Sequence, residues 1–180
     1  MILTADYHTH TPYSHGKNTV LENATAAKAA GLKEIGITDH GFNHILFGLK
    51  RKKLAALRAE ISEAEKLTGV KVLMGMESNI TSSDGATDMR KDDLQYFDLY
   101  LCGIHEVLRF KRISDFYRIC VKNYSAYKFA VRPSNKVIAN TTKTYIEAIK
   151  NNPIDVLTHV NYKCFCDLVQ VPQCCADYAT

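Results

Sequence analysis

Five short apolar segments of this chain end on a histidine or a glutamate, residue types that bind transition-metal ions in proteins. The segments ILTADYHTH, EIGITDH, VKVLMGME, DLYLCGIH and IDVLTH deliver His8 and His10, His40, Glu77, His105 and His159. One histidine after an apolar run is more often a buried polar group satisfied by its neighbours. Five such endings are hard to explain by packing alone, so the pattern predicts a hydrolytic site that holds several metal ions.

The first segment places two histidines on one face of a strand. His8 and His10 are one residue apart, so on an extended strand both side chains point the same way and can chelate one ion. Asp6 lies on the same face, where it can accept an imidazole N–H and orient that ligand. His15 follows in the loop PYSHGKN, near enough to lie over the same strand end. Taken alone, His15 is equally well interpreted as an exposed loop residue.

The other strand ends add a carboxylate to the imidazoles. His40 ends the segment EIGITDH. Asp39 is placed to orient a metal ligand by a hydrogen bond, without binding the ion itself. Glu77 ends an apolar run, where an unpaired carboxylate is costly to desolvate, so we expect a cation beside it. Its two oxygens can bridge two ions, and His105 and His159 then complete a second cluster. We expect Glu77, His40 and Asp39 to act most directly in catalysis.

Four further polar residues near these motifs are harder to place. His44 lies in the loop FNHILFG with no strand before it, and we interpret it as structural or incidental. Arg109, Lys111 and Arg112 follow His105 and are placed to meet a phosphate. A solvated surface charge is nevertheless the more frequent role for any one of these three residues.

Length and composition are those of one globular domain. The 180 residues are 46% hydrophobic and 23% charged, which excludes the disordered and fibrous classes. The net charge of +4 is spread along the chain except for a basic cluster at residues 50–53. Nucleic-acid binding is therefore permitted but not demanded, and a solvated helix face is the more frequent meaning of such a cluster.

The expected compartment rests on the N-terminal segment and on the lengths of the apolar runs. The N-terminal segment has no basic region followed by a long apolar stretch, and no run is long enough to cross a bilayer, so we expect a cytoplasmic protein without a membrane partner. The six cysteines include no CxxC pair and are expected to be free thiols there. Zinc binding by the four C-terminal cysteines is disfavoured, because their spacing matches no common finger.

Strand-like and helix-like segments alternate along the chain. Helices are expected over 19–33, 49–69, 114–129 and 137–151, with a last one near the C-terminus. Gly31 and Gly69 are placed as C-terminal stops, and Pro133 separates the third helix from the fourth. The second helix has an apolar face, formed by Leu54, Leu57, Ile61 and Ala64.

Apolar strands that alternate with helices indicate an α/β fold with a parallel sheet. In a barrel of this kind, functional residues collect at the carboxyl ends of the strands, where every candidate ligand lies. An open doubly wound sheet gathers its ligands near one switch point, so contributions from five strand ends favour the barrel. A closed barrel usually needs about 250 residues, and five strand-helix units leave this chain two or three units short.

Taken in order, the motifs DYHTHT, SHG, ITDHG, GMESNI, GIHE and LTH resemble the metal motifs of the PHP family, named for polymerase and histidinol phosphatase. The likeness covers nearly the whole chain and is closest to the stand-alone phosphoesterase branch. It implies a distorted TIM-like (β/α)7 barrel that binds up to three ions. The resemblance also implies three ligand sets: His8, His10 and Glu77 for one ion, His15 and His40 for a second, and Glu77, His105 and His159 for a third.

The chain departs from the family pattern after His159. The family's last motif is an Asp-x-His that completes the first and second metal sites, and the sequence reaches Thr180 without it. We therefore expect residues 1–180 to be the N-terminal portion of a PHP domain, with two of its three metal sites incomplete. LTHVNY stands where Pro-Gly often follows the histidine, which alters the loop and spares the ligand.

The ligand types and the resemblance together predict phosphoester hydrolysis. Imidazole and carboxylate suit zinc, manganese or iron, and closely spaced ions lower the pKa of a bound water enough to form hydroxide near neutral pH. We expect that hydroxide to attack a small phosphomonoester, such as histidinol phosphate or a nucleotide. One alternative is a nuclease acting on nucleic-acid ends, for which the basic cluster at 50–53 would have to flank the metal cleft. Another is a catalytically silent barrel that binds a partner.

Overall fold

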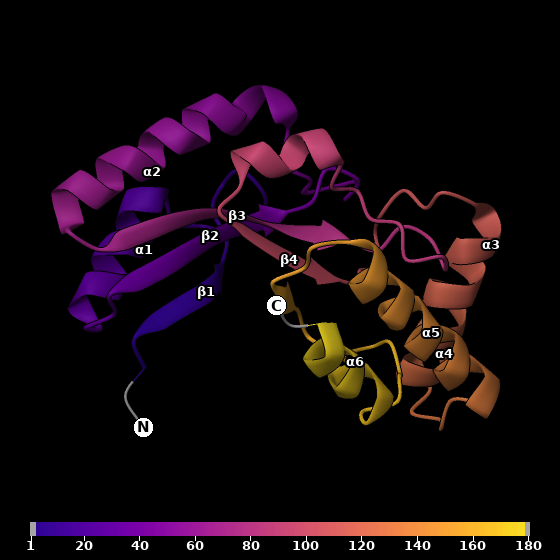
Figure 1. Ribbon diagram of the computed structural model, residues 1–180. Coiled ribbons are helices and arrows are strands. Elements are labelled where there is room, and N and C mark those ends of the chain that lie inside the picture. The colour runs from indigo at the N-terminus through magenta and orange to yellow at the C-terminus, as the bar shows by residue number, and fades with distance from the viewer. Residues whose placement is uncertain (1–2, 179–180) are drawn as a thin grey trace.

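The five apolar segments form five parallel strands, paired in the chain order β1-β2-β3-β4-β5 (Figure 1). The computed structural model describes residues 3–178. The strands are β1 (Ala5–Thr9), β2 (Glu34–His40), β3 (Lys71–Asn79), β4 (Leu99–Gly103) and β5 (Val156–Leu157). Because every pair is parallel, the carboxyl ends of all five strands lie at one edge of the sheet.

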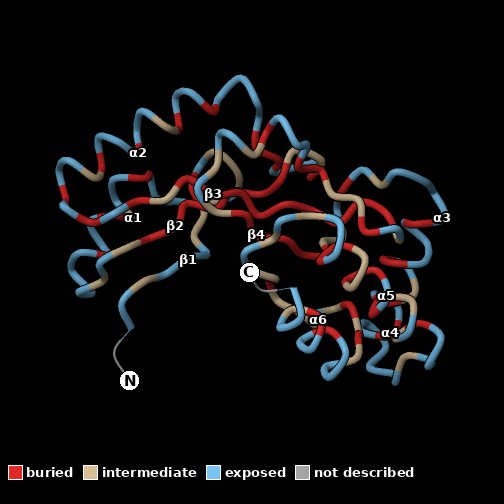
Figure 2. Tube along the Cα trace, in the orientation of Figure 1, coloured by how far each residue is buried: buried red, intermediate tan, exposed pale blue. Residues whose placement is uncertain are grey.

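Helices connect the strands and divide into two groups. They are α1 (Val20–Ala29), α2 (Leu54–Thr68), α3 (Ile113–Asp115), α4 (Lys122–Lys128), α5 (Asn135–Asn151) and α6 (Gln170–Tyr178). Short 3-10 helices form at Arg51–Lys53 and Lys91–Tyr96. α1 and α2 lie together over the first strands, whereas α3 to α6 gather beyond β4 (Figure 1). The strands β2, β3 and β4 are the most continuously buried part of the trace (Figure 2).

The amphipathic helix predicted over 49–69 is confirmed as α2 and the 3-10 turn before it. Its predicted apolar face is buried against the sheet, as seen for Leu54, Leu57, Ile61 and Ala64. Burying an aliphatic side chain in this way contributes about 1.5–3 kcal/mol. The helix ends at Gly69, whose φ of 72° is the left-handed conformation that favours glycine.

Three elements differ from the expectation. β1 is largely exposed, because β2 is its one neighbour within the described residues. β5 has two residues, so the chain leaves the sheet before it reaches His159. The helix expected over 114–129 contains a π-helical segment at Phe116–Val121, between α3 and α4.

The sheet curls, so its five strands and their helices form half of a TIM-like barrel (Figure 1). The predicted α/β class and the count of five strand-helix units are thereby confirmed. Within residues 3–178, no helix combines the length and the apolar character that a membrane span requires.

Candidate metal centre

Glu77 lies at the centre of the site, and three imidazoles meet one oxygen of its carboxylate. Oε1 lies 3.2 Å from Nε2 of His8, 3.2 Å from Nε2 of His105 and 2.8 Å from Nε2 of His159. β1 carries His8, and the other two histidines follow β4 and β5. The parallel sheet thus brings residues of four strand segments together at one oxygen atom, Oε1 of Glu77.

The second oxygen of this carboxylate faces two more imidazoles. Oε2 lies 2.9 Å from Nδ1 of His40 and 3.6 Å from Nε2 of His10. The register of β2 and β3 pairs His40 with Glu77, so the backbone itself sets the shorter contact. Oε2 is buried and accepts no hydrogen bond of good geometry, although His40 is this close. A cation shared by the two groups would satisfy both.

Glu77 is 1% exposed, so an isolated negative charge at this position would be costly. Burial opposes its ionisation, but hydrogen bonds from His105, His159 and the neighbouring imidazoles hold the pKa of Glu77 well below its usual range. The carboxylate is therefore charged at neutral pH and is available to a bound cation.

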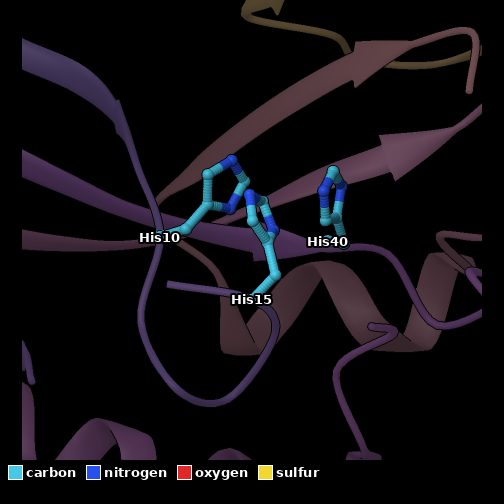
Figure 3. A group of neighbouring side chains, drawn as sticks. All are labelled: His10, His15 and His40. Carbon is cyan, nitrogen blue, oxygen red and sulfur yellow. The ribbon is translucent and has the colours of Figure 1, made fainter. Parts of the chain in front are cut away.

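A second group of nitrogen donors consists of His10, His15 and His40, whose rings lie close together (Figure 3). Their ligand atoms lie within 4.8 Å of one another. His10 directly follows β1, His40 ends β2, and His15 is carried by the loop that joins β1 to α1. This loop turns tightly over the strand end at Gly16, where a Cβ would overlap the carbonyl group of His10.

Asp39 holds that loop and accepts no hydrogen bond from an imidazole within residues 3–178. Its carboxylate accepts hydrogen bonds from Thr11 N at 2.8 Å, Thr11 Oγ1 at 2.6 Å and Ser14 Oγ at 2.5 Å. Burial raises the pKa of Asp39, and these hydrogen bonds oppose the shift. The expected contact with a ligand imidazole is thus replaced by one with the loop that carries His15. Asp6 also differs from the expectation, because its carboxylate accepts a hydrogen bond from the backbone N–H of His8, at 3.0 Å, in place of one from an imidazole.

His105 and His159 form a pair beside Oε1 of Glu77. Their Nε2 atoms are 3.2 Å apart. Two nitrogens bound to one tetrahedral zinc ion at about 2.0–2.1 Å are separated by about 3.3 Å, so this spacing fits a shared ion. His159 has a φ of 30°, a left-handed conformation that is uncommon outside glycine and that persists where surrounding contacts hold it.

Burial keeps three of these imidazoles neutral at neutral pH. Burial lowers the pKa of His10 to about 3, and the nearby His40 adds to the effect. Burial also lowers the pKa values of His15 and His105. The hydrogen bond with Glu77 instead raises the pKa of His8. Since an imidazole binds a metal ion in its neutral form, His10, His15 and His105 already have the form of a ligand.

All seven predicted metal ligands therefore meet at one edge of the sheet. They form three overlapping groups, which are His8–His10–Glu77, His10–His15–His40 and His40–Glu77–His105, with His159 beside the third. Each group offers three protein ligands, the number typical of catalytic zinc sites that keep a position open. The donor set of imidazole and carboxylate fits zinc, manganese or iron. This grouping differs from the three ligand sets that the family resemblance implied, because His10 and His40 each belong to two groups.

A cavity of about 230 Å³ adjoins these groups, and its walls include His15, His40, His105 and His159. The basic residues expected to meet a phosphate lie outside its walls. Lys111 and Arg112 turn toward the exposed carboxylate of Asp84, at 3.4 and 3.7 Å. The backbone N–H of Arg109 donates to the carbonyl of Asn43, and its side chain is exposed. The path of this loop therefore directs the three charges to solvent.

Three polar residues that the sequence analysis did not select lie in the cavity wall, namely His44, Glu106 and Lys163. Lys163 Nζ lies 3.4 Å from Glu106 Oε1 and 5.2 Å from the centre of the Tyr162 ring. Glu106 directly follows His105 in the motif GIHE, which is a usable sequence signal. Lys163 has no such signal, because the turn after His159 alone brings it here.

A parallel half-barrel with clustered histidines around a buried glutamate at its strand ends defines a metal-binding α/β protein. The family model of the PHP domain matches residues 6–170, and the chain belongs to the PHP family. The recognition made from the motifs is thus confirmed.

Relatives and solved structures agree with this assignment. The chain is 31% identical over 165 residues to a protein of Thermoanaerobacter sp. (strain X514) named "probable phosphatase", covering 88% of this chain and 54% of that one. A "probable phosphatase" of Shewanella baltica (strain OS195) is 28% identical over 180 residues, covering 96% and 58%. The chain spans little more than half the length of these relatives.

The fold is similar to the crystal structure of histidinol phosphate phosphatase from Lactococcus lactis subsp. lactis, complexed with zinc, L-histidinol and phosphate. The TM-score is 0.62 at 15% sequence identity, and the likeness covers 97% of this chain and 70% of that one. At this identity the comparison shows the shared fold.

Proposed function

We propose that this chain carries the metal centre of a phosphoesterase that hydrolyses a small phosphomonoester. The observation that carries the proposal is the convergence of five imidazoles on the two oxygens of the buried Glu77. The names of the relatives and the fold shared with a zinc-containing histidinol phosphate phosphatase support the same class of reaction.

The chain's own residues prepare the site for this reaction. When bound, zinc, manganese or iron ions supply the Lewis acidity that activates water for attack on phosphorus and that neutralises the leaving oxygen. Glu77 would provide a charge that two neighbouring ions could share, and the imidazoles would complete each ligand group. Asp39 holds the loop of His15 in place, which keeps the ligands organised before the substrate arrives.

The cavity supports a small substrate. Its volume of about 230 Å³ lies below the range of most drug-sized pockets, which begins near 300 Å³. Besides the imidazoles, its walls include the apolar or aromatic side chains of Phe47, Ile104, Ile119 and Tyr124. A compact phosphomonoester with a partly apolar alcohol, similar to histidinol phosphate, matches this combination.

The nuclease alternative required the basic cluster at 50–53 to flank the metal cleft. None of these four residues lines the cavity beside the candidate ligands. Arg51 is instead paired with Asp93 at 2.6 Å and lies over the Phe42 ring. No observation in the described residues therefore favours the nuclease over the phosphatase.

The test is hydrolysis of an aryl phosphate and of histidinol phosphate, with zinc or manganese added and with chelator as the blank. We expect metal-dependent release of phosphate, and a loss of at least about 100-fold in Glu77→Gln, since removing the shared charge weakens two ligand groups. Full metal loading without release of phosphate from either ester would favour the silent barrel. Degradation of single-stranded DNA in preference to both esters would favour the nuclease.

A further inference from the structure

His44 lies in the cavity wall beside the candidate ligands, and the proposed function gives it no role. The residue is 7% exposed. Its ring stacks on His40 at 4.7 Å and 19°, and it meets the ring of His105 edge-on at 6.2 Å. The loop after β2 carries His44, so the pattern of strand-end ligands does not include it.

The segment around His44 is held firmly. His44 forms an isolated antiparallel bridge with Leu108, in the loop that follows β4. The backbone N–H of Asn43 donates to the buried carboxylate of Asp88 at 2.8 Å. At Gly48 the chain turns so closely that a Cβ would lie 2.6 Å from the carbonyl oxygen of His44. The ring therefore has a fixed position relative to the cavity.

One hydrogen bond determines which ring nitrogen of His44 carries the proton. Nδ1 accepts the backbone N–H of Phe47 at 3.1 Å. A nitrogen that accepts is unprotonated, so the neutral ring carries its proton on Nε2. Nε2 makes no hydrogen bond to any residue between 3 and 178. It is also not one of the fully buried nitrogen atoms that lack a hydrogen-bond partner, such as Nδ1 of His10 and Nδ1 of His40. The ring is thus an unused donor in the cavity wall.

The same hydrogen bond disfavours His44 as a further metal ligand. Binding through Nε2 would move the ring proton to Nδ1, where it would face the N–H of Phe47. Two opposed donors leave a buried group unsatisfied, which costs about 1–3 kcal/mol.

We propose that His44 contacts the substrate and donates a hydrogen bond from Nε2 to a non-bridging oxygen of its phosphoryl group. The inference rests on the proposed function and extends it to a residue outside the ligand set. A neutral donor binds the phosphoryl oxyanion without adding positive charge beside the metal ions. Such a bond to a charged acceptor is strong, and it strengthens further where negative charge grows during reaction.

The test compares three variants that separate donation from packing. His44→Asn retains an acceptor for the Phe47 N–H and loses the donor at Nε2. His44→Phe retains the ring stack on His40 and loses the same donor. His44→Gln is the matched control, since its amide N–H reaches the region of Nε2. Thermal melting establishes that each variant is folded, and elemental analysis establishes its metal content.

The decisive readout is binding of inorganic phosphate to the zinc-loaded protein by calorimetry, followed by kcat and KM for an aryl phosphate. We expect His44→Asn and His44→Phe to keep their ions and to bind phosphate about 10- to 100-fold more weakly, the range for one hydrogen bond to a charged group. His44→Gln should recover part of the loss. A matching fall in kcat/KM is expected.

Three results would overturn the inference. If the Asn and Phe variants lose metal ions, His44 is a metal ligand. If these variants keep their metal content and also their affinity for phosphate, His44 has a packing role alone. Absence of turnover in the wild-type chain would count against the proposed function alone, because phosphate affinity still decides the role of His44. A zinc-loaded wild-type chain that binds no phosphate would overturn both.

Discussion

Nε2 of His159 lies 2.8 Å from Oε1 of Glu77, although the two residues are 82 positions apart in the chain. β3 carries the glutamate, and β4 separates it from β5, after which the histidine follows. The other oxygen of the same carboxylate meets His40 on β2. One side chain thus joins the ligands of the first strands to those of the last.

Glu77→Gln should lose more metal than any single histidine variant. The glutamate, like His10 and His40, belongs to two of the three ligand groups, but it alone supplies a negative charge, which the amide removes. Elemental analysis after gel filtration measures the loss. The control is His15→Ala, which removes a ligand from one group only. Equal losses from the two variants would contradict the bridging role.

The protein should bind up to three transition-metal ions and be stabilised by them. Three overlapping groups of donors are present, and ions that bind the folded state alone raise its stability by mass action. With ions at about 100 times their dissociation constant, each site adds about 2.7 kcal/mol. Melting with and without chelator checks the stabilisation, and elemental analysis checks the number. A content of one ion or fewer after gentle purification would remove the three-ion interpretation.

Asp39→Ala should destabilise the protein by about 2–3 kcal/mol and weaken the site that contains His15. The change removes three hydrogen bonds and leaves the fully buried Thr11 hydroxyl without its acceptor. Urea unfolding measures the stability, and metal titration measures the site. Asp6→Ala is the control, because that exposed carboxylate makes one backbone contact and its loss should cost under about 0.5 kcal/mol. Similar losses in both variants would argue against a specific anchor.

The metal-free protein should lose stability as the pH falls from 6.5 toward 5. His10 and His44 have folded pKa values of about 3 and about 4, so in this window the unfolded chain takes up protons that the folded chain does not. Each such group lowers the free energy of unfolding by up to about 1.4 kcal/mol per pH unit. His8 acts in the opposite sense, because its pKa is raised and its contribution is present at low pH.

We therefore expect a net loss of roughly 2 kcal/mol between pH 6.5 and 5 for the chelated protein. Urea unfolding at the two pH values, in the presence of chelator, is the measurement. An unfolding midpoint that stays constant or rises on acidification would show that these imidazoles are protonated in the folded state.

Local patterns in the sequence predicted most of the architecture. The buried face of α2, including Leu57 and Ile61, follows from helical spacing, and the exact span of β2 follows from an apolar run between turn signals. Six of the seven proposed ligands were found because they lie at the ends of such runs, and parallel strands present their carboxyl ends at one edge; His15 was found from its place in the loop after the first run. The exposure of β1 was not foreseen, since strand neighbours depend on topology rather than on composition.

The sequence by itself determined the residue types at the strand ends, and with them the chemistry of the donors. Only the tertiary structure decided the partners of the loop residues. Asp39 meets Thr11, Arg109 turns to solvent, and His44 enters the cavity wall, because long-range hydrogen bonds set the paths of their loops. A strand alternates its side chains with a fixed period, so its contacts can be read from spacing. A loop has no such period, and its side chains point where its anchors hold the backbone.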